Sequence, residues 1–312
     1  MSVLESRAVT EALDFVLYAQ HGWADSCKAI ATLAKAVATP KTRLITPDLG
    51  YIRTWLRIEP LIQQVERIAI DTFTSYPNTP VRIIGHSMGG LIWLEVLSRH
   101  PEWWSQVESL VLIASPVGGA DLARIFDPLG IGIGMARDLG RNRRQMAESI
   151  ATVIPTLAIA GDIDNGSDGT ITVETTKFSH AKFVGLPGLS HAVLKNHPRV
   201  AEIIRDFWAK PPVRHLPPEP DLSAQLIQRL RLLPGMTEAH RRDFYRAKAL
   251  INFKNGISIL TWKNPVQVDH VFVANTEGQC LYGGFVGWMH AKALRITLED
   301  MKKQHHHTCK QI

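Results

Sequence analysis

The sequence predicts an α/β protein with a mainly parallel β-sheet covered by helices on both faces, followed by a small α+β module. The first observation is the alternation of short apolar runs with segments of helical periodicity through residues 1–210. The second is a strand that turns directly into a helix at residues 81–97, through a glycine-rich bend. The third is a cluster of prolines in residues 211–220, which is typical of a stiff linker. We therefore expect a domain at 1–210, a linker at 211–220 and a module at 221–312.

The first domain is expected to contain six strands, because apolar runs of strand length are bounded there by turn residues. They are residues 14–19, 43–46, 81–84, 107–114, 153–160 and 180–184. Apolar residues at helical spacing follow several of them, over residues 24–37, 61–73, 88–97 and 198–208. Strands that alternate with helices usually pair in parallel and bind ligands at their carboxyl ends, so we expect the functional site there.

The composition indicates a globular chain without a membrane span. Of the 312 residues, 45% are hydrophobic and 21% are charged, and no uninterrupted apolar run reaches the ~18 residues that a spanning helix needs. The N-terminus carries acidic residues where a signal peptide would have a basic start and an apolar run, so we expect no secretion. The cysteines are far apart, at Cys27, Cys280 and Cys309. This spacing favours a reducing compartment, and we expect a cytoplasmic protein.

Residues 221–312 are expected to form the α+β module. Helical periodicity covers residues 222–233 and 290–303. Strand-like runs lie at residues 250–253, 257–262, 268–274 and 280–286. Lys254, Asn255 and Gly256 indicate a hairpin turn between the first two of these strands. The module resembles no family known to us.

The net charge of +6 lies in the C-terminal third of the chain. Residues 211–312 hold 14 Lys and Arg against 8 Asp and Glu, whereas residues 1–210 hold 21 of each kind. Six of the basic residues are Arg229, Arg231, Arg241, Arg242, Arg246 and Lys248. They could attract an anionic membrane weakly, although we favour a solvated basic face. We expect no nucleic-acid partner.

No metal site or cofactor is expected. Asp162, Asp164 and Asp168 lie close together after the fifth strand, but a hard-cation loop needs more oxygen ligands at set spacing. The histidine run 305–307 with Cys309 has metal-binding side chains, and a frayed terminus is the interpretation that we favour.

The stretch 81–90, VRIIGHSMGG, carries the strongest chemical signal in the chain. A strand that turns at once into a helix needs a tight bend, in which the central residue is strained and bulky neighbours collide. Gly85, Gly89 and Gly90 are the small neighbours, and Ser87 is the central residue. Such a bend exposes the serine hydroxyl above the carboxyl edge of the sheet, at the positive end of the next helix. Ser87 is therefore a candidate nucleophile, and an ordinary glycine-rich turn is the alternative.

Further features accompany this motif, namely HGW at residues 21–23, SPVGG at 115–119, a late acidic loop and a late histidine. Together with GHSMGG at 85–90 they resemble the α/β-hydrolase family over roughly residues 12–209. SPVGG is similar to a stretch of the lipase-like members, and the usual first hairpin is expected to be missing. The resemblance implies an α/β-hydrolase fold and a serine hydrolase that cleaves carboxylic (acyl) esters of small molecules or lipids.

The resemblance also implies a Ser-His-Asp triad. A serine hydroxyl needs a general base, and the base needs an acid that fixes its tautomer. The family places its histidine after the sixth strand, which implies His191 here. The family's acid is commonly followed after two or three positions by an apolar residue, and Asp168, before Ile171, matches best. Asp162 and Asp164 remain candidates, and we interpret them as structural turn residues.

Charge that develops on the carbonyl oxygen of the substrate requires backbone amides directed at it. The amide of Met88, at the start of a helix, is one candidate, and the resemblance implies the amide of Trp23 as the second. Among the other histidines, we expect His21 to shape this loop, His86 to point away from the nucleophile and His197 to start a helix.

Residues 118–145 combine apolar residues with glycines, which suits a mobile apolar cover over the site and a greasy substrate. A packed connecting segment is the alternative. Two other functions also stay open at this point. One is a thioesterase or acyltransferase on the same triad, and the other is a catalytically silent scaffold that binds a partner through the module.

Overall fold

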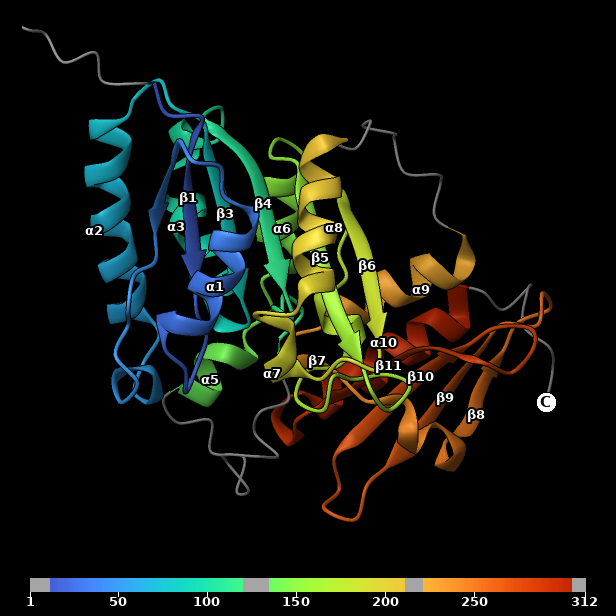
Figure 1. Ribbon diagram of the computed structural model, residues 1–312. Coiled ribbons are helices and arrows are strands. Elements are labelled where there is room, and N and C mark those ends of the chain that lie inside the picture. The colour runs from blue at the N-terminus through green and yellow to red at the C-terminus, as the bar shows by residue number, and fades with distance from the viewer. Residues whose placement is uncertain (1–11, 120–134, 211–220, 305–312) are drawn as a thin grey trace, which may run out of the picture.

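The computed structural model describes residues 12–119, 135–210 and 221–304. Within these ranges the chain forms two β-sheets (Figure 1). Residues 120–134 of the expected apolar cover lie outside the described residues, as do the proline-rich linker, the histidine tail and Cys309.

The first sheet is parallel throughout and has the strand order β2–β1–β3–β4–β5–β6. Its strands are β1 (Phe15–Gln20), β2 (Thr42–Ile45), β3 (Val81–His86), β4 (Val107–Ile113), β5 (Thr156–Asp162) and β6 (Ala181–Pro187). The order reverses between β1 and β3, and open parallel sheets bind ligands at such a switch point. The predicted parallel sheet is confirmed.

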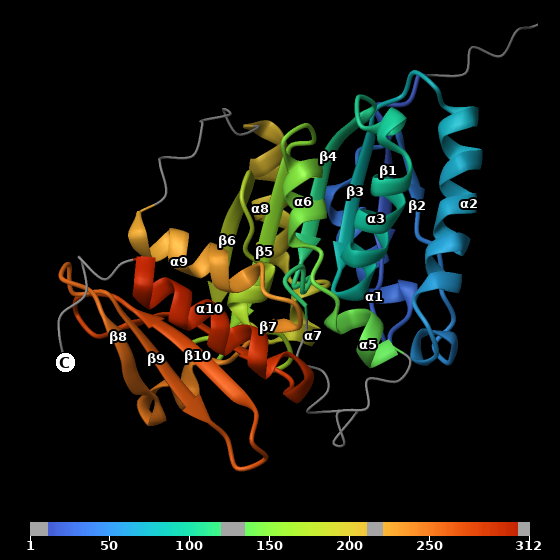
Figure 2. The same cartoon turned by 180° about the vertical axis from the view of Figure 1, so that it is seen from behind.

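Helices cover both faces of this sheet (Figures 1 and 2). One face carries α1 (Cys27–Val37) and α8 (Pro198–Ala209), and the other carries α2 (Glu59–Ser75), α3 (Met88–Arg99) and α6 (Arg144–Ala151).

Alternate residues of β1 show why its sequence is apolar at nearly every position. Val16 and Tyr18 belong to the core with α2 and α3, whereas Leu17 and Ala19 belong to the core with α1 and α8. A strand that is buried on both faces has no solvent side, so polar residues do not alternate with apolar ones.

One strand begins later than the sequence pattern indicates. The apolar run starts at Val153, but β5 starts at Thr156. The amides of Val153 and Ile154 both donate to the carbonyl oxygen of Ile150, at 3.1 and 2.8 Å, so these residues continue the last turn of α6. Pro155 follows and separates this turn from the strand.

The second sheet is antiparallel, with the order β7–β11–β10–β9–β8. Its strands are β7 (Met236–Glu238), β8 (Lys248–Asn252), β9 (Ser258–Lys263), β10 (Asp269–Ala274) and β11 (Cys280–Val286). α9 (Leu222–Arg231) and α10 (Ala291–Gln304) pack on this sheet around an apolar core of their own. The predicted α+β class is confirmed, but β7 was not predicted, because three residues are too few to show an alternating pattern.

The C-terminal module lies at the carboxyl edge of the first sheet, next to the ends of β5 and β6 (Figures 1 and 2). This edge also carries two short helices, α5 (Met135–Gly140) and α7 (His191–Leu194). None of the helices in the described ranges is long and apolar enough to cross a membrane.

Candidate active site

Ser87 occupies a strained bend between β3 and α3. Its φ angle is 54°, in the left-handed region that residues with a side chain rarely adopt, and its amide donates to Ile113 O of β4 at 2.8 Å. The glycines around it are packed against backbone. A Cβ atom on Gly85 would lie 2.6 Å from the nitrogen of Gly90, and one on Gly89 would collide with the carbonyl oxygen of Gln20. The bend therefore forms only with glycine at these positions.

The loop after β5 and the start of α7 bring an acid and a histidine together. Nδ1 of His191 lies 2.7 Å from Oδ2 of Asp168, and the amide of His191 donates to the carbonyl oxygen of Asp168 at 2.9 Å. The other carboxylate oxygen of Asp168 accepts the amides of Thr170 and Ile171, at 2.9 and 2.7 Å. The Asp168 side chain is only 2% exposed, so these contacts hold a buried carboxylate in one orientation.

The two other aspartates of this loop hold its backbone. Oδ1 of Asp162 accepts the amide of Gly166 at 2.9 Å. Asp164 accepts the amide and the hydroxyl of Ser167, each at 2.8 Å. Although partial burial acts to raise the pKa of Asp164, hydrogen bonds from Ser167 and His240 hold this pKa below its usual value. Both side chains thus stabilise turns of the loop.

The loop after β1 lies directly against the bend at Ser87 between β3 and α3, which we call the elbow. A Cβ atom on Gly22 would be 2.9 Å from Ser87 Cβ and 3.3 Å from the amide nitrogen of Met88. His21 is fully buried and shapes this loop, because its Nδ1 donates to Gly22 O at 3.0 Å and its Nε2 accepts the amide of Leu49 at 3.0 Å. These contacts require the neutral ring, and burial lowers the pKa of His21.

Ser87 and His191 line the same pocket, which has a volume of about 200 Å³. Its apolar lining residues are Trp23, Ala24, Pro116, Leu139, Ile171 and Ala192. The packing of Trp23 against Trp55, with ring centroids 4.2 Å apart, supports one side of this pocket. Leu139 belongs to α5, which lies within the expected apolar cover, so this cover contributes to the wall of the pocket.

His86 contacts the candidate base, although we expected its side chain to point away from the nucleophile. It also lines the pocket, and its Nε2 donates to the backbone oxygen of His191 at 3.1 Å. The centroids of the two imidazole rings are 4.8 Å apart. Burial, and then the charge of His191, place the pKa of His86 well below the usual value for histidine. His86 is therefore a neutral neighbour of His191. His197 caps α8, as expected, by accepting the amide of Arg199 at 3.2 Å.

One charged pair at the pocket was missed by sequence reasoning. Lys195 Nζ lies 2.8 Å from Asp25 Oδ2, and both residues line the pocket. The pair joins the loop after β1 to the segment after α7, although the two residues are 170 positions apart in the chain. No local signal in the sequence connects them.

Two of the basic residues that we considered for membrane contact face carboxylates of the chain. Nε of Arg231 lies 2.8 Å from Oε1 of Glu238, and Nη2 of Arg241 lies 2.7 Å from Oε1 of Glu174. These two guanidinium groups are therefore paired with carboxylates of the chain. Within the described ranges, no three His, Cys, Asp or Glu side chains cluster as metal ligands.

A parallel sheet with helices on both faces and a strand-serine-helix elbow at its switch point defines an α/β-hydrolase. The family profile described as "Serine aminopeptidase, S33" matches residues 12–170, about half of the chain. The chain belongs to this family, and it is a hydrolase. The C-terminal module lies outside the matched residues.

Several solved structures are similar to this chain at low sequence identity. Mature lipase BlEst2 of Bacillus licheniformis is 14% identical, with a TM-score of 0.48 over 64% of this chain and 93% of that one. Est1E of Butyrivibrio proteoclasticus, bound to ferulic acid, is 14% identical, with a TM-score of 0.49 over 64% and 90%. The lin2722 product of Listeria innocua is 15% identical, with a TM-score of 0.46 over 65% and 96%. No curated protein matches the chain significantly.

Proposed function

We propose that the chain is a serine hydrolase of carboxylic esters in which Ser87 is the nucleophile, His191 the general base and Asp168 the acid. The observation that carries this proposal is the 2.7 Å contact between Nδ1 of His191 and Oδ2 of Asp168, at the pocket that Ser87 lines. A buried carboxylate that accepts Nδ1–H leaves Nε2 as the acceptor, and this is the tautomer that a base for serine needs.

The reaction proceeds in two halves. Oγ of Ser87 attacks the ester carbonyl while Nε2 of His191 takes its proton, and the resulting oxyanion accepts hydrogen bonds from the amides of Trp23 and Met88. Collapse of this intermediate breaks the ester C–O bond, and His191 returns the proton to the leaving alcohol. Water then attacks the acyl-serine with His191 again as the base, which releases the carboxylic acid and restores Ser87.

The pocket favours an apolar and uncharged substrate group. Six of its lining residues are apolar, and such surfaces gain free energy by excluding water from a hydrocarbon group. An aminopeptidase would need a carboxylate for the ammonium group of its substrate. Among the described lining residues the carboxylate is that of Asp25, and Lys195 already pairs with it at 2.8 Å. A small-molecule or lipid ester therefore fits better than the free amino terminus of a peptide.

The same groups support thioester cleavage or acyl transfer, because these reactions differ only in the leaving atom or in the acceptor of the acyl group. The substrate panel in the test below separates ester cleavage from thioester cleavage. It contains a p-nitrophenyl ester, an acyl thioester with the same acyl group, and an aminoacyl p-nitroanilide.

The test is covalent labelling by a fluorophosphonate probe, which reports whether a serine is activated. We expect stoichiometric labelling of the full chain at Ser87, no labelling of Ser87→Ala, and turnover fastest on the oxygen ester. Labelling that persists in Ser87→Ala, or an unlabelled wild-type chain, would remove the proposed nucleophile. Preference for the aminoacyl anilide would keep the triad and replace the ester substrate.

A further inference from the structure

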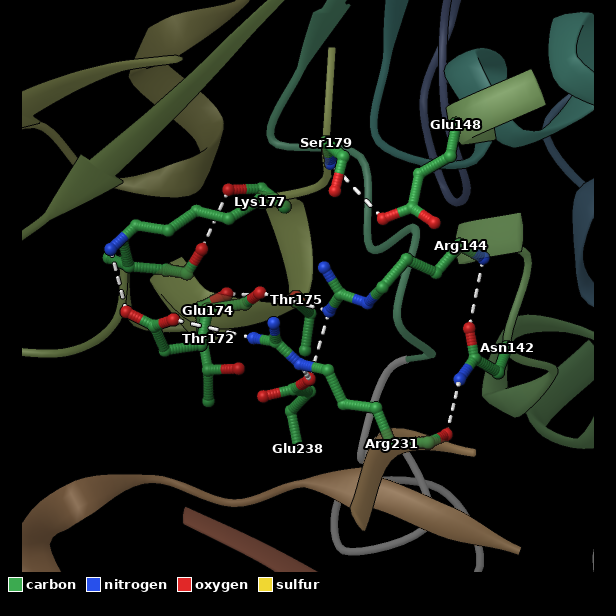
Figure 3. A network of polar contacts seen from close by, with 12 residues as sticks. Asn142, Arg144, Glu148, Thr172, Glu174, Thr175, Lys177, Ser179, Arg231 and Glu238 are labelled. Carbon is green, nitrogen blue, oxygen red and sulfur yellow. Dashed lines mark hydrogen bonds and ion pairs between the residues drawn. The ribbon is translucent and has the colours of Figure 1, made fainter. Parts of the chain in front are cut away.

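The C-terminal module contacts the loop that carries Asp168 through a network of buried charges (Figure 3). The network joins Arg144 of α6 and Glu174 of the 3₁₀ helix η3 (Val173–Thr176) to Arg231 and Glu238 of the module. In this view the side chain of Arg144, from the first domain, points toward those of Arg231 and Glu238, from the module.

Glu238, the last residue of β7, is the central carboxylate. Its Oε1 lies 2.9 Å from Nη2 of Arg144 and 2.8 Å from Nε of Arg231. The side chains of Glu238 and Arg144 are only 3% and 8% exposed. A buried guanidinium without a counter-charge is strongly unfavourable, so Arg144 of the first domain depends on this carboxylate of the module.

Arg144 and Arg231, together with Arg241, hold η3. Nη2 of Arg144 also donates to the carbonyl oxygen of Glu174 at 3.2 Å. The Glu174 carboxylate lies 2.7 Å from Arg241 Nη2 and 3.6 Å from Arg231 Nη2. Glu174 is thus fixed through its backbone by α6 and through its side chain by the module.

η3 is connected to the candidate acid by a short stretch of chain that contains several backbone hydrogen bonds. The amide of Val173, the first residue of η3, donates to the carbonyl oxygen of Gly166 at 2.9 Å. Just before η3, the amide of Ile171 donates to Oδ1 of Asp168 at 2.7 Å. A displacement of η3 therefore moves an amide that orients the Asp168 carboxylate.

A second contact reaches the other side of the loop. Nε2 of His240, two residues after Glu238, lies 3.2 Å from Oδ1 of Asp164. Asp164 in turn holds the amide of Ser167, the residue before Asp168, at 2.8 Å. The module thus contacts this loop both before and after the acid.

We propose that Glu238 is a positioning residue for Asp168, and that the C-terminal module completes the active site by holding the acid loop. Glu238 acts through Arg144 and Arg231, which fix η3 and with it the amides around the Asp168 carboxylate. This inference rests on the proposed function, because it assigns a consequence to the position of the acid.

The experiment compares Glu238→Gln with Glu277→Gln in the full chain. Both variants replace a carboxylate of the module by an amide, but Glu277 lies in an exposed turn between β10 and β11. Labelling to completion with the fluorophosphonate counts the competent sites, so kcat is expressed per site. A positioning defect lowers kcat, whereas loss of folded protein lowers only the number of sites.

We expect kcat per site to fall about 10-fold in Glu238→Gln, with KM within about 2-fold of wild type, because small misplacements of catalytic groups cost up to ~100-fold. The deshielded proton NMR signal of the hydrogen shared by His191 and Asp168 should weaken or shift. Glu277→Gln should match wild type in every measurement, and Glu238→Asp should recover part of the loss.

Two outcomes overturn the proposal. One is an unchanged kcat per site with an unchanged proton signal in Glu238→Gln, and the other is an equal loss in Glu277→Gln. If Glu238→Gln does not fold, the test uses Arg241→Gln, which removes a contact between the module and Glu174 at a half-exposed position. The control is Arg242→Gln, at the exposed neighbouring position. Equal kcat in these two variants would mean that the module does not hold the acid loop, and this overturns the proposal. If the wild-type chain takes no label, the proposed function fails instead, while the proton signal still reports whether Glu238 positions Asp168.

Discussion

Nε2 of His86 lies 3.1 Å from the backbone oxygen of His191, so the residue before the candidate nucleophile contacts the candidate base. A carbonyl oxygen accepts only, and His86 therefore carries its hydrogen on Nε2. The contact links the elbow after β3 to the start of α7, which lie 105 residues apart. It connects His191 to the residue before Ser87 through a ring that burial keeps neutral.

The buried neutral state of His86 predicts a loss of stability in acid. Its folded pKa is well below the usual value, whereas in the unfolded chain the ring takes up a proton near pH 6.5. As the pH falls below ~6.5 the unfolded state binds a proton that the folded state does not, so the free energy of unfolding falls by up to ~1.4 kcal/mol per pH unit. Urea denaturation from pH 7.5 to 5.5 should show this decline.

His86→Gln should make that decline shallower, because glutamine keeps a donor but does not titrate. His21, whose pKa burial also lowers, accounts for part of the remaining slope. The control is His180→Gln, at an exposed position. Equal pH slopes in wild type and His86→Gln would contradict the buried neutral state.

Substitution of each of the three loop aspartates by asparagine should show which of them acts as the acid, because only that change should lower kcat strongly. In Asp168→Asn the amide group would donate to Nδ1 of His191 and hold the wrong tautomer, so kcat should fall by about 10⁴-fold with the fold intact. Asp162→Asn and Asp164→Asn remove turn contacts to Gly166 and Ser167, so they should lower the melting temperature more than kcat. Ester hydrolysis and thermal denaturation of the three variants give the comparison. A greater kcat loss in Asp162→Asn or Asp164→Asn would transfer the role of the acid.

Gly89→Ala should destabilise the protein although Gly89 lies in a helix, where alanine usually stabilises by ~1 kcal/mol. The new methyl group would lie 2.7 Å from the carbonyl oxygen of His21, which belongs to fixed backbone. Overpacking of this kind costs about 1–3 kcal/mol and displaces the loop that lies against the elbow. Gly287→Ala is the control, because a Cβ atom there meets nothing within 4 Å. Chemical denaturation should separate the two, and equal stabilities would mean that the elbow tolerates a methyl group.

Trp23→Ala should separate substrate binding from chemistry. Its side chain lines the pocket, while the proposed oxyanion contact comes from its backbone amide, which alanine retains. We expect KM for an apolar ester to rise about 10-fold, equivalent to ~1.4 kcal/mol, with kcat within about 3-fold. Trp288→Ala, at a tryptophan that is 66% exposed in the module, should change neither. A fall in kcat without a change in KM would place the indole in the chemical step.

The elbow could be predicted because all of its determinants are local. A buried strand, three glycines, the serine and the next helix lie within residues 81–97, and tight packing restricts each position to few residue types. The parallel sheet was predictable for a similar reason, since strands buried on both faces are apolar throughout. β7 was missed because three residues carry no period.

The partners of the charged side chains were decided only by the tertiary structure. Arg231 and Arg241 contribute to a basic composition in the sequence, yet in the folded chain they face Glu174 and Glu238. Likewise Asp25 meets Lys195 from 170 residues away, and Glu238 meets Arg144 from 94 residues away. A carboxylate and a guanidinium attract any opposite charge, so the residue type alone does not specify the partner. Which pair forms depends on which elements pack together, and burial then makes that pair costly to break.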